Sequence, residues 1–198
     1  MSGTDVRGAA RTRTTRETEI SLEITVGGQQ AAVVATSFAP LGHMLDALCL
    51  YAGIGGRVSA AGDVAVDPHH LIEDVGWVLG EAFDDLLSSR EGIARYGLAV
   101  VPMDDALVRA ALDFSGRAYC RLGGIAPETL ALGTDLGTWR EFFWAFCRTA
   151  GATLHLDVLA GENSHHVVEA MFKATGMALR QATALTGGGL LSTKGVIG

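Results

Sequence analysis

The sequence contains the pattern His-His-x-x-Glu twice, and this repeat limits the possible folds more than any other feature. The first copy is HHLIE at residues 69–73 and the second is HHVVE at residues 165–169, 96 positions later. The same shift aligns Gly80 with Gly176. A match at one fixed spacing indicates an internal duplication, in which each half of the chain is one structural unit.

The first half reads as two strands, a helix, a strand and a helix. Alternating apolar and polar residues on both sides of Gly27-Gly28 predict a β-hairpin, and apolar residues at helical spacing predict the helices. We expect Asp67 to cap the second helix and Pro68 to precede it. The predicted elements are a hairpin over residues 17–36, a helix over 41–52, a strand over 57–61 and a helix that begins at His69.

The second half repeats this order. It is predicted to contain two strands within residues 95–122, a helix that ends at Gly151, the strand TLHLDVLA and a final helix that begins at NSHHVV. We therefore expect two β-β-α-β-α halves, over residues 13–92 and 93–198, with a disordered arm at residues 1–12. Helices segregated on antiparallel sheets make an α+β sandwich.

Composition excludes several classes of protein. The chain has 198 residues, of which 48% are hydrophobic, so it can bury a full core. The net charge of −7 argues against nucleic-acid binding, which needs clustered cations. No apolar run is long enough to span a membrane, and the N-terminus has no signal-peptide core. Three unpaired cysteines in apolar stretches predict buried thiols in a reducing cytosol. A basic cluster near the start is most simply a solvated arm; it comprises Arg7, Arg11, Arg13 and Arg16.

The chemistry of the repeated motif indicates metal binding. On a helix, residues at i and i+3 or i+4 share a face, so Glu73 can approach an ion held by either His69 or His70. Adjacent histidines diverge by about 100° around the helix axis, so each pair is better placed to contact two ions than to chelate one. A single pair would also be typical of a polar helix start, whereas two matched pairs favour a site. The order of residues excludes the HEXXH and HXXEH zinc motifs. Imidazole and carboxylate donors suit Mn²⁺, Fe²⁺ or Zn²⁺, and the carboxylates favour manganese.

Cations scattered through the second half suggest a phosphorylated substrate. The glycine-rich tail lacks the order of a P-loop, but its serine and lysine are suited to bind a phosphate. Each of these cations taken alone is equally typical of an exposed surface, whereas together with a metal site they predict a small phosphorylated ligand. The candidates are Arg95, Arg117, Lys173, Ser192 and Lys194.

Several stretches together resemble the imidazoleglycerol-phosphate dehydratase family. The resemblance runs from about Arg13 to Gly195, and it rests on RETEI, HMLDAL, GDVAVDPHHLIEDVG, RYGLAVVPMDDAL, DFSGR, LHLDVLAGENSHHVVEAMFKA and STKG. It implies a duplicated α+β fold of the ribosomal S5 domain 2-like type and a cytoplasmic hydro-lyase of histidine biosynthesis. Such an enzyme dehydrates imidazole glycerol phosphate to imidazole acetol phosphate. It also implies trimers that assemble into twenty-four-subunit shells, with two manganese ions per subunit bound at sites completed between subunits.

The resemblance also implies roles for individual residues. Glu17, the glutamate of RETEI, matches the position of the family's acid/base. The five cations and hydroxyls above match its phosphate-binding positions. The metal ligands that it implies, for manganese or another divalent transition metal, are His43, His69, His70, Glu73, His155, His165, His166 and Glu169.

Four positions depart from the family pattern around the first motif. Gly42 stands where the family has an aspartate before the ligating histidine, Tyr51 replaces a histidine, Pro68 an aspartate and Leu71 a threonine. Loss of an outer carboxylate typically weakens metal affinity or activity by about 10–100-fold. The sequence is therefore compatible with a compensated dehydratase, with a paralogue that takes another phosphorylated substrate, or with a non-catalytic oligomeric metal-binding protein. Retention of Glu17 and the phosphate-binding set favours the enzyme.

Overall fold

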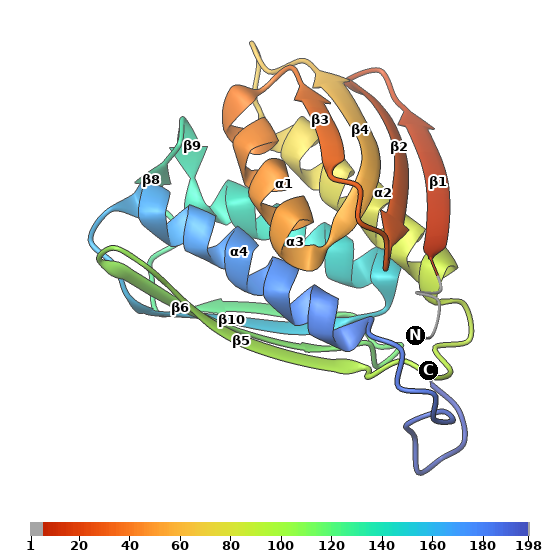
Figure 1. The fold of residues 1–198 in the computed structure, drawn as a ribbon. Helices are drawn as coiled ribbons and strands as arrows, with labels where there is room; N and C mark the ends of the chain where they lie inside the picture. Colours follow the sequence, from red (N-terminus) through yellow and green to blue (C-terminus); the bar gives the residue numbers. More distant parts are fainter. Residues whose placement is uncertain (1–5, 198) are drawn as a thin grey trace.

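The computed structural model describes residues 6–197, which form two four-stranded sheets around four long helices (Figure 1). The first half comprises β1 (Arg7–Thr14), β2 (Thr18–Val26), β3 (Ala32–Thr36), α1 (Ala39–Ala52), β4 (Ile54–Gly62) and α2 (His69–Leu87). The second half comprises β5 (Tyr96–Met103), β6 (Ala106–Asp113), β7 (Tyr119–Gly123), β8 (Leu130–Ala131), β9 (Thr134–Asp135), α3 (Leu136–Ala150), β10 (Thr153–Ala160) and α4 (Ser164–Ala182).

The two sheets have the same topology, which supports the predicted duplication. Their strand orders are β1-β2-β4-β3 and β5-β6-β10-β7. In each sheet the first three strands are antiparallel and the fourth pairs in parallel with the third. The α+β fold in two halves is therefore confirmed. Each half carries one strand more than the sequence pattern indicated, so the repeat is β-β-β-α-β-α.

The predicted disordered arm is wrong for residues 7–12, which belong to β1. This strand pairs with β2 along its whole length. Its arginines form ion pairs with α2, from Arg11 to Asp85 at 2.6 Å and from Arg13 to Asp74 at 3.0 Å. A segment with few apolar residues can therefore form an edge strand, because backbone hydrogen bonds to β2 and ion pairs to α2 stabilise it. The rest of the predicted arm, residues 1–5, lies outside the described part of the chain.

The predicted hairpin over residues 17–36 is also wrong. Both of its strands exist, but β4 lies between them and pairs with each. β3 runs parallel to β4 through the α1 crossover, as parallel strands require. The missed strand β7 has the same relation to β10 through α3. In contrast, the two strands predicted at the start of the second half are confirmed, and β5 and β6 pair directly across the turn at residues 104–105.

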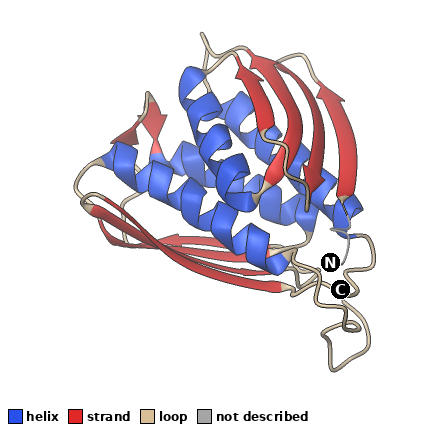
Figure 2. Ribbon diagram, in the orientation of Figure 1, coloured by secondary structure: helices blue, strands red, loops and turns tan. Residues whose placement is uncertain are grey.

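The helices form the inside of the sandwich. α1 and α2 cover the first sheet, α3 and α4 cover the second, and the two helix layers meet as α1 against α4 and α2 against α3 (Figure 2). The centre is aromatic: Trp139 and Phe142 of α3 lie 5.7 Å and 4.9 Å, between ring centroids, from Phe172 of α4. The three cysteines are free and buried, as predicted.

The predicted helix boundaries hold closely. Asp67 accepts a hydrogen bond from the backbone N–H of His69 at the start of α2, at 2.8 Å. Gly53 and Gly151 end α1 and α3 with φ angles of 68° and 59°, a conformation that favours glycine. No helix within residues 6–197 is long and apolar enough to cross a membrane.

Candidate metal and substrate site

The start of α4 carries a compact cluster of metal-ligand side chains. Asn163 caps the helix by accepting a hydrogen bond from the backbone N–H of His165 at 2.9 Å. One turn later Glu169 lies on the same face, and its Oε2 is 3.2 Å from His165 Nε2. His43 reaches the same oxygen from α1, with its Nε2 at 3.3 Å. These three residues, the α4 cluster, offer donor atoms that all lie within 4.8 Å of one another.

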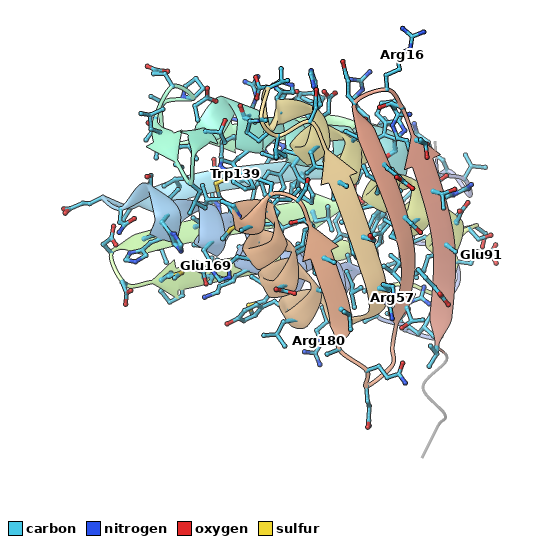
Figure 3. All side chains as sticks on the ribbon, turned by 90° about the horizontal axis from the view of Figure 1, so that it is seen from above. Arg16, Arg57, Glu91, Trp139, Glu169 and Arg180 are labelled. Carbon is cyan, nitrogen blue, oxygen red and sulfur yellow. The ribbon has the colours of Figure 1, made fainter. Side chains whose placement is uncertain are left out.

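Glu169 is held as an anion inside this cluster. Its side chain is only 9% exposed, and burial alone would raise its pKa. The Lys173 ammonium, 2.8 Å from Oε1, and the His43 imidazole outweigh that effect, so the pKa of Glu169 is lowered. Figure 3 shows Glu169 beside α1, near the edge of the helix layers. Two imidazoles and one ionised carboxylate are a donor set that fits a divalent transition metal.

The start of α2 carries the first copy of the motif in a more open form. His69 Nε2 lies 3.5 Å from Glu73 Oε2. The neighbouring His70 turns away from this pair, as expected for adjacent helix positions, and its Nδ1 lies 3.3 Å from Asp63 Oδ1. The Glu17 carboxylate is 3.7 Å from the same nitrogen. The hydrogen bond that the His70 imidazole donates to Asp63, together with the nearby carboxylates, raises the pKa of His70.

His166 is oriented by the β5–β6 turn rather than by its own helix. Its Nδ1 lies 2.6 Å from Asp105 Oδ1, and its Nε2 lies 3.6 Å from Asp104 Oδ2. The His166 hydrogen bond, supported by two backbone N–H donors, holds the pKa of Asp105 well below its usual range. A carboxylate on Nδ1 leaves Nε2 as the free ligand nitrogen, an arrangement common around metal-ligating histidines.

Sequence reasoning missed these orienting aspartates. In the sequence, Asp104 and Asp105 belong to the stretch RYGLAVVPMDDAL and Asp63 to GDVAVDPHHLIEDVG, and neither stretch assigns them a role. The one available signal was their position in the chain, because each of these aspartates lies just after a predicted strand. It does not reveal which histidine each aspartate contacts.

His155 lies apart from both motifs. It is on the outer face of the second sheet, since its neighbours Leu154 and Leu156 point into the core. Its ring is 5.4 Å from that of Tyr119. Within one subunit the predicted ligands therefore form two separate groups, which are the α4 cluster and the His69–Glu73 pair. His70, His166 and His155 lie outside both groups.

Most of the predicted phosphate-binding residues line one pocket of about 730 Å³ between the second sheet and the C-terminal tail; they are Arg95, Arg117, Ser192 and Lys194. Arg95 is fixed there by Asp113, at 2.7 Å, and by the carbonyl oxygen of Leu191. The fifth candidate, Lys173, is not in this pocket, because it lies in the α4 cluster beside Glu169.

The tail pocket and the α4 cluster lie at opposite ends of α4. The helix has 19 residues, so its ends are about 28 Å apart at 1.5 Å per residue. Figure 1 shows α4 running from the β8–β9 end of the molecule to the C-terminal tail. One small molecule cannot reach both places within a single subunit.

The four departures from the family pattern have separate surroundings. A Cβ at Gly42 would meet Thr36 Oγ1 at 3.1 Å, so a side chain there needs a small adjustment of Thr36. Tyr51 receives Lys173 over its ring at 5.6 Å. Leu71 is fully buried, and Pro68 is the N-cap residue of α2. None of these four side chains contributes a donor atom to the α4 cluster.

Comparison with known proteins identifies the family. A family model described as imidazoleglycerol-phosphate dehydratase matches residues 36–179. The chain belongs to the imidazoleglycerol-phosphate dehydratase family. The dehydratase of that name from Deinococcus radiodurans is 46% identical over 194 residues, which cover 96% of this chain and 98% of that protein. The one from Lacticaseibacillus casei is 44% identical and covers 97% of this chain and 100% of its own.

Two solved structures of the family share the fold. The enzyme from Pyrococcus furiosus superimposes with a TM-score of 0.82 at 40% identity and covers 94% of this chain and all of its own. The enzyme from Staphylococcus aureus gives 0.78 at 29% identity, with 90% of this chain and 99% of its own covered. This chain therefore shares its duplicated α+β fold with both of these proteins, and the departures around the first motif do not disturb it.

Proposed function

We propose that the protein is an imidazoleglycerol-phosphate dehydratase, which converts imidazole glycerol phosphate to imidazole acetol phosphate in histidine biosynthesis. The observation that carries the proposal is the presence, in one chain of this family, of the α4 cluster and of a separate cationic tail pocket. The first suits a metal that holds an imidazole ring, and the second suits the phosphate at the other end of the substrate. Three free buried cysteines accord with a cytoplasmic location.

The reaction removes a proton that is not next to a carbonyl, so no enolate can stabilise the charge that develops. The imidazole ring of the substrate must supply the electrons that expel the hydroxyl group. A divalent metal in the donor set supplies Lewis acidity and a template for the ring. Glu17, whose side chain is 54% exposed, is free to take the proton as a base. The enol that results then becomes the ketone.

We assign two divalent ions per subunit, with manganese as the preferred metal. The three donors of the α4 cluster and the pair His69–Glu73 are both mixed nitrogen and oxygen sets without thiolate, which suits Mn²⁺. Neither set fills an octahedral shell within one subunit. His70, His155 and His166 are the remaining imidazoles available to complete them.

We propose that each active site is assembled from several copies of the chain. The tail pocket follows the C-terminal end of α4, and the helix from Glu169 to Ala182 is about 20 Å long at 1.5 Å per residue, which exceeds the length of the substrate. His155 lies near the tail pocket, because Thr153, two residues before it, is 3.2 Å from Ser115 in the pocket wall. One subunit thus presents His155 with the pocket, while a neighbour presents a motif helix. This supports a homo-oligomer, for which we adopt the trimer-based twenty-four-subunit shell.

The alternatives make different use of the same residues. A metal-storage shell has no need for Glu17 beside His70 or for a cationic pocket, and the presence of both favours the enzyme. A paralogue with another phosphorylated imidazole substrate would keep both. The assay below separates the paralogue from the dehydratase.

The test is the turnover of imidazole glycerol phosphate by purified protein with Mn²⁺, followed by the absorbance of the enolised ketone. Glu17→Gln should keep its metal and lose about 10²–10⁴-fold in turnover, the usual scale for a positioned base. Glu19→Gln, an exposed neighbour on β2, is the control and should retain turnover. A metal-loaded wild type without product would overturn the dehydratase assignment. Normal turnover in Glu17→Gln would remove only the role of Glu17.

Gly42→Asp refines the same assay. A carboxylate beside His43 should tighten metal binding and raise activity if the surrounding pocket fits the family substrate, once Thr36 moves by a few tenths of an ångström. If wild type and Gly42→Asp are both inactive while metal-loaded and assembled, a different phosphorylated imidazole becomes the substrate to seek.

A further inference from the structure

The turn between β1 and β2, which carries Glu17, is held rigid by its own side chains. Thr15 Oγ1 accepts hydrogen bonds from the backbone N–H groups of Glu17, at 3.1 Å, and Thr18, at 3.0 Å. The backbone N–H of Thr15 donates to the carbonyl of Thr18 at 2.8 Å. A threonine hydroxyl in such a turn accepts hydrogen bonds from backbone N–H groups that would otherwise lack an acceptor within the turn. The backbone at Glu17 is therefore fixed on its N–H side.

The same turn is attached to α2 through Asp74. The hydroxyl of Thr18, which is 4% exposed, donates to Asp74 Oδ2 at 2.6 Å. The other carboxylate oxygen accepts from Arg13 Nε at 3.0 Å. Arg13 in turn lies over the ring of Trp77 at 5.7 Å. Asp74 thus holds both strands of the turn, one on each oxygen, from the helix that carries His69, His70 and Glu73.

A third contact closes the arrangement from β4. The carbonyl of Glu17 accepts the backbone N–H of Asp63 at 3.0 Å. Gly62 allows this approach, because a Cβ there would lie 3.2 Å from both Glu17 O and Leu71 Cβ. Asp63 is also the partner of His70 Nδ1. The backbone of Glu17 is consequently held on both sides, while its side chain stays exposed.

We propose that Thr18 and Asp74 are positioning residues that fix the Glu17 carboxylate over the histidine end of α2. The inference rests on the proposed role of Glu17 as the base. An exposed glutamate on a free turn would sample many positions, and a misplacement of about 1 Å is enough to cost on the order of 10²-fold in rate. The hydrogen bond from Thr18 to Asp74 removes that freedom without touching the substrate or the metal.

A double-mutant cycle tests this directly. Thr18→Val removes the hydroxyl at constant volume, and kcat should fall by about tenfold or more with little change in KM and in metal content. Thr18→Ser, which keeps the hydroxyl, should recover most of the loss. Thr12→Val, at an exposed position of β1 in the same sheet, is the matched control and should leave kcat unchanged. In the Glu17→Gln background, Thr18→Val should have no further effect, because a positioning residue has nothing left to position.

The possible results distinguish the positioning role of Thr18 and Asp74 from the role of Glu17 as the base. If Glu17→Gln is slow and Thr18→Val lowers its kcat by the same factor as in the wild type, the positioning role is wrong and the role of Glu17 stands. Loss of metal in Thr18→Val, or an unchanged kcat, also overturns the positioning role. Full turnover of Glu17→Gln overturns both. Asp74→Asn, which keeps the shape of the side chain, is the second variant should Thr18→Val fail to fold, and the same kcat and cycle criteria apply to it.

Discussion

At the scale of single residues, the two histidines of each motif have different tasks. The first of each pair, His69 or His165, faces the glutamate one turn later on its own helix. The second, His70 or His166, turns to an aspartate from a neighbouring strand end, which occupies Nδ1. The difference follows from the 100° between adjacent helix positions. In each pair, one imidazole therefore faces the glutamate of its own helix and the other faces an aspartate from a different element.

Glu169 is the one carboxylate in the α4 cluster. Glu169→Gln should lower metal affinity by at least about tenfold, because it removes the only charge among three donors while the helix remains intact. The measurement is metal content per subunit after dialysis against graded chelator. Glu162→Gln, an exposed position before the same helix, should keep the wild-type metal content. Equal retention of metal by both variants would contradict the assignment of the α4 cluster.

At the scale of elements, the halves are joined by helices that cross at aligned glycines. A Cβ at Gly80 of α2 would lie 2.5 Å from the carbonyl oxygen of Phe146 in α3, and one at Gly176 of α4 would lie 2.7 Å from that of Leu48 in α1. The repeat that aligned these glycines in the sequence thus has a packing cause. Each permits the backbone of a helix from the other half to approach closely.

Gly80→Ala should therefore destabilise the fold despite the better helix propensity of alanine. Overpacking typically costs about 1–3 kcal/mol, which exceeds the gain in propensity of up to about 1 kcal/mol. Thermal or denaturant unfolding gives the difference. Gly28→Ala, where the nearest atom would be 3.9 Å away, is the control and should change stability little. A Gly80→Ala protein as stable as the wild type would show that the two helices separate at little cost.

The second sheet is cross-linked on its outer face by a charged triplet. Asp157 of β10 pairs with Arg109 of β6 at 2.8 Å and with Arg121 of β7 at 2.5 Å. The hydrogen bond from Arg109, and then that from Arg121, lowers the pKa of Asp157 against the opposing effect of burial. One carboxylate therefore links three neighbouring strands.

This lowered pKa predicts a pH dependence of stability. A carboxylate whose pKa is lower in the folded state stabilises the fold above its unfolded pKa of about 3.9, and the contribution is lost as the pH falls through the folded value. Asp157→Asn should thus cost about 0.5–1 kcal/mol at pH 7, the scale of partly exposed ion pairs. Unfolding curves from pH 7 down to about pH 3 should show the difference from wild type shrinking. A difference that grows toward acid pH would contradict the sign of this linkage.

At the scale of the whole molecule, the sandwich places complementary parts of a site at distant positions. The α4 cluster lies at one end of α4, the tail pocket follows the other end, and His155 is on the outer face of the second sheet. Within one subunit these three parts therefore stay apart from one another. Association between copies is the proposed means by which these parts meet.

Assembly should consequently depend on metal. Removal of a bridging ion leaves imidazole and carboxylate groups without their shared partner, so chelation should reduce the particle size, and added Mn²⁺ should restore it. Light scattering before and after treatment with EDTA measures this. Glu169→Gln is the internal comparison, since it should respond like chelated wild type. A large particle of constant size throughout would mean that apolar contacts alone hold the copies together.

Much of the candidate site was predictable because its signals are local. The motif HHxxE places a histidine and a glutamate on one helix face by spacing alone, and the structure brings His165 within 3.2 Å of Glu169. Asp67, at the start of α2, and Gly151, at the end of α3, also lie next to the helices that they bound. What the sequence did not reveal is which aspartate orients which histidine, since Asp105 and His166 are 61 positions apart.

The sequence by itself determined the duplication, the long helices and the family, because periodicity and motif spacing are properties of neighbouring residues. Only the tertiary structure decided that β1 is a strand, that β4 separates β2 from β3, and that His43 meets Glu169 while His155 does not. The physical reason is that a strand pattern specifies two faces but not a hydrogen-bonding partner. Partners are chosen by packing and ion pairs between residues far apart in the chain, such as Arg13 and Asp74.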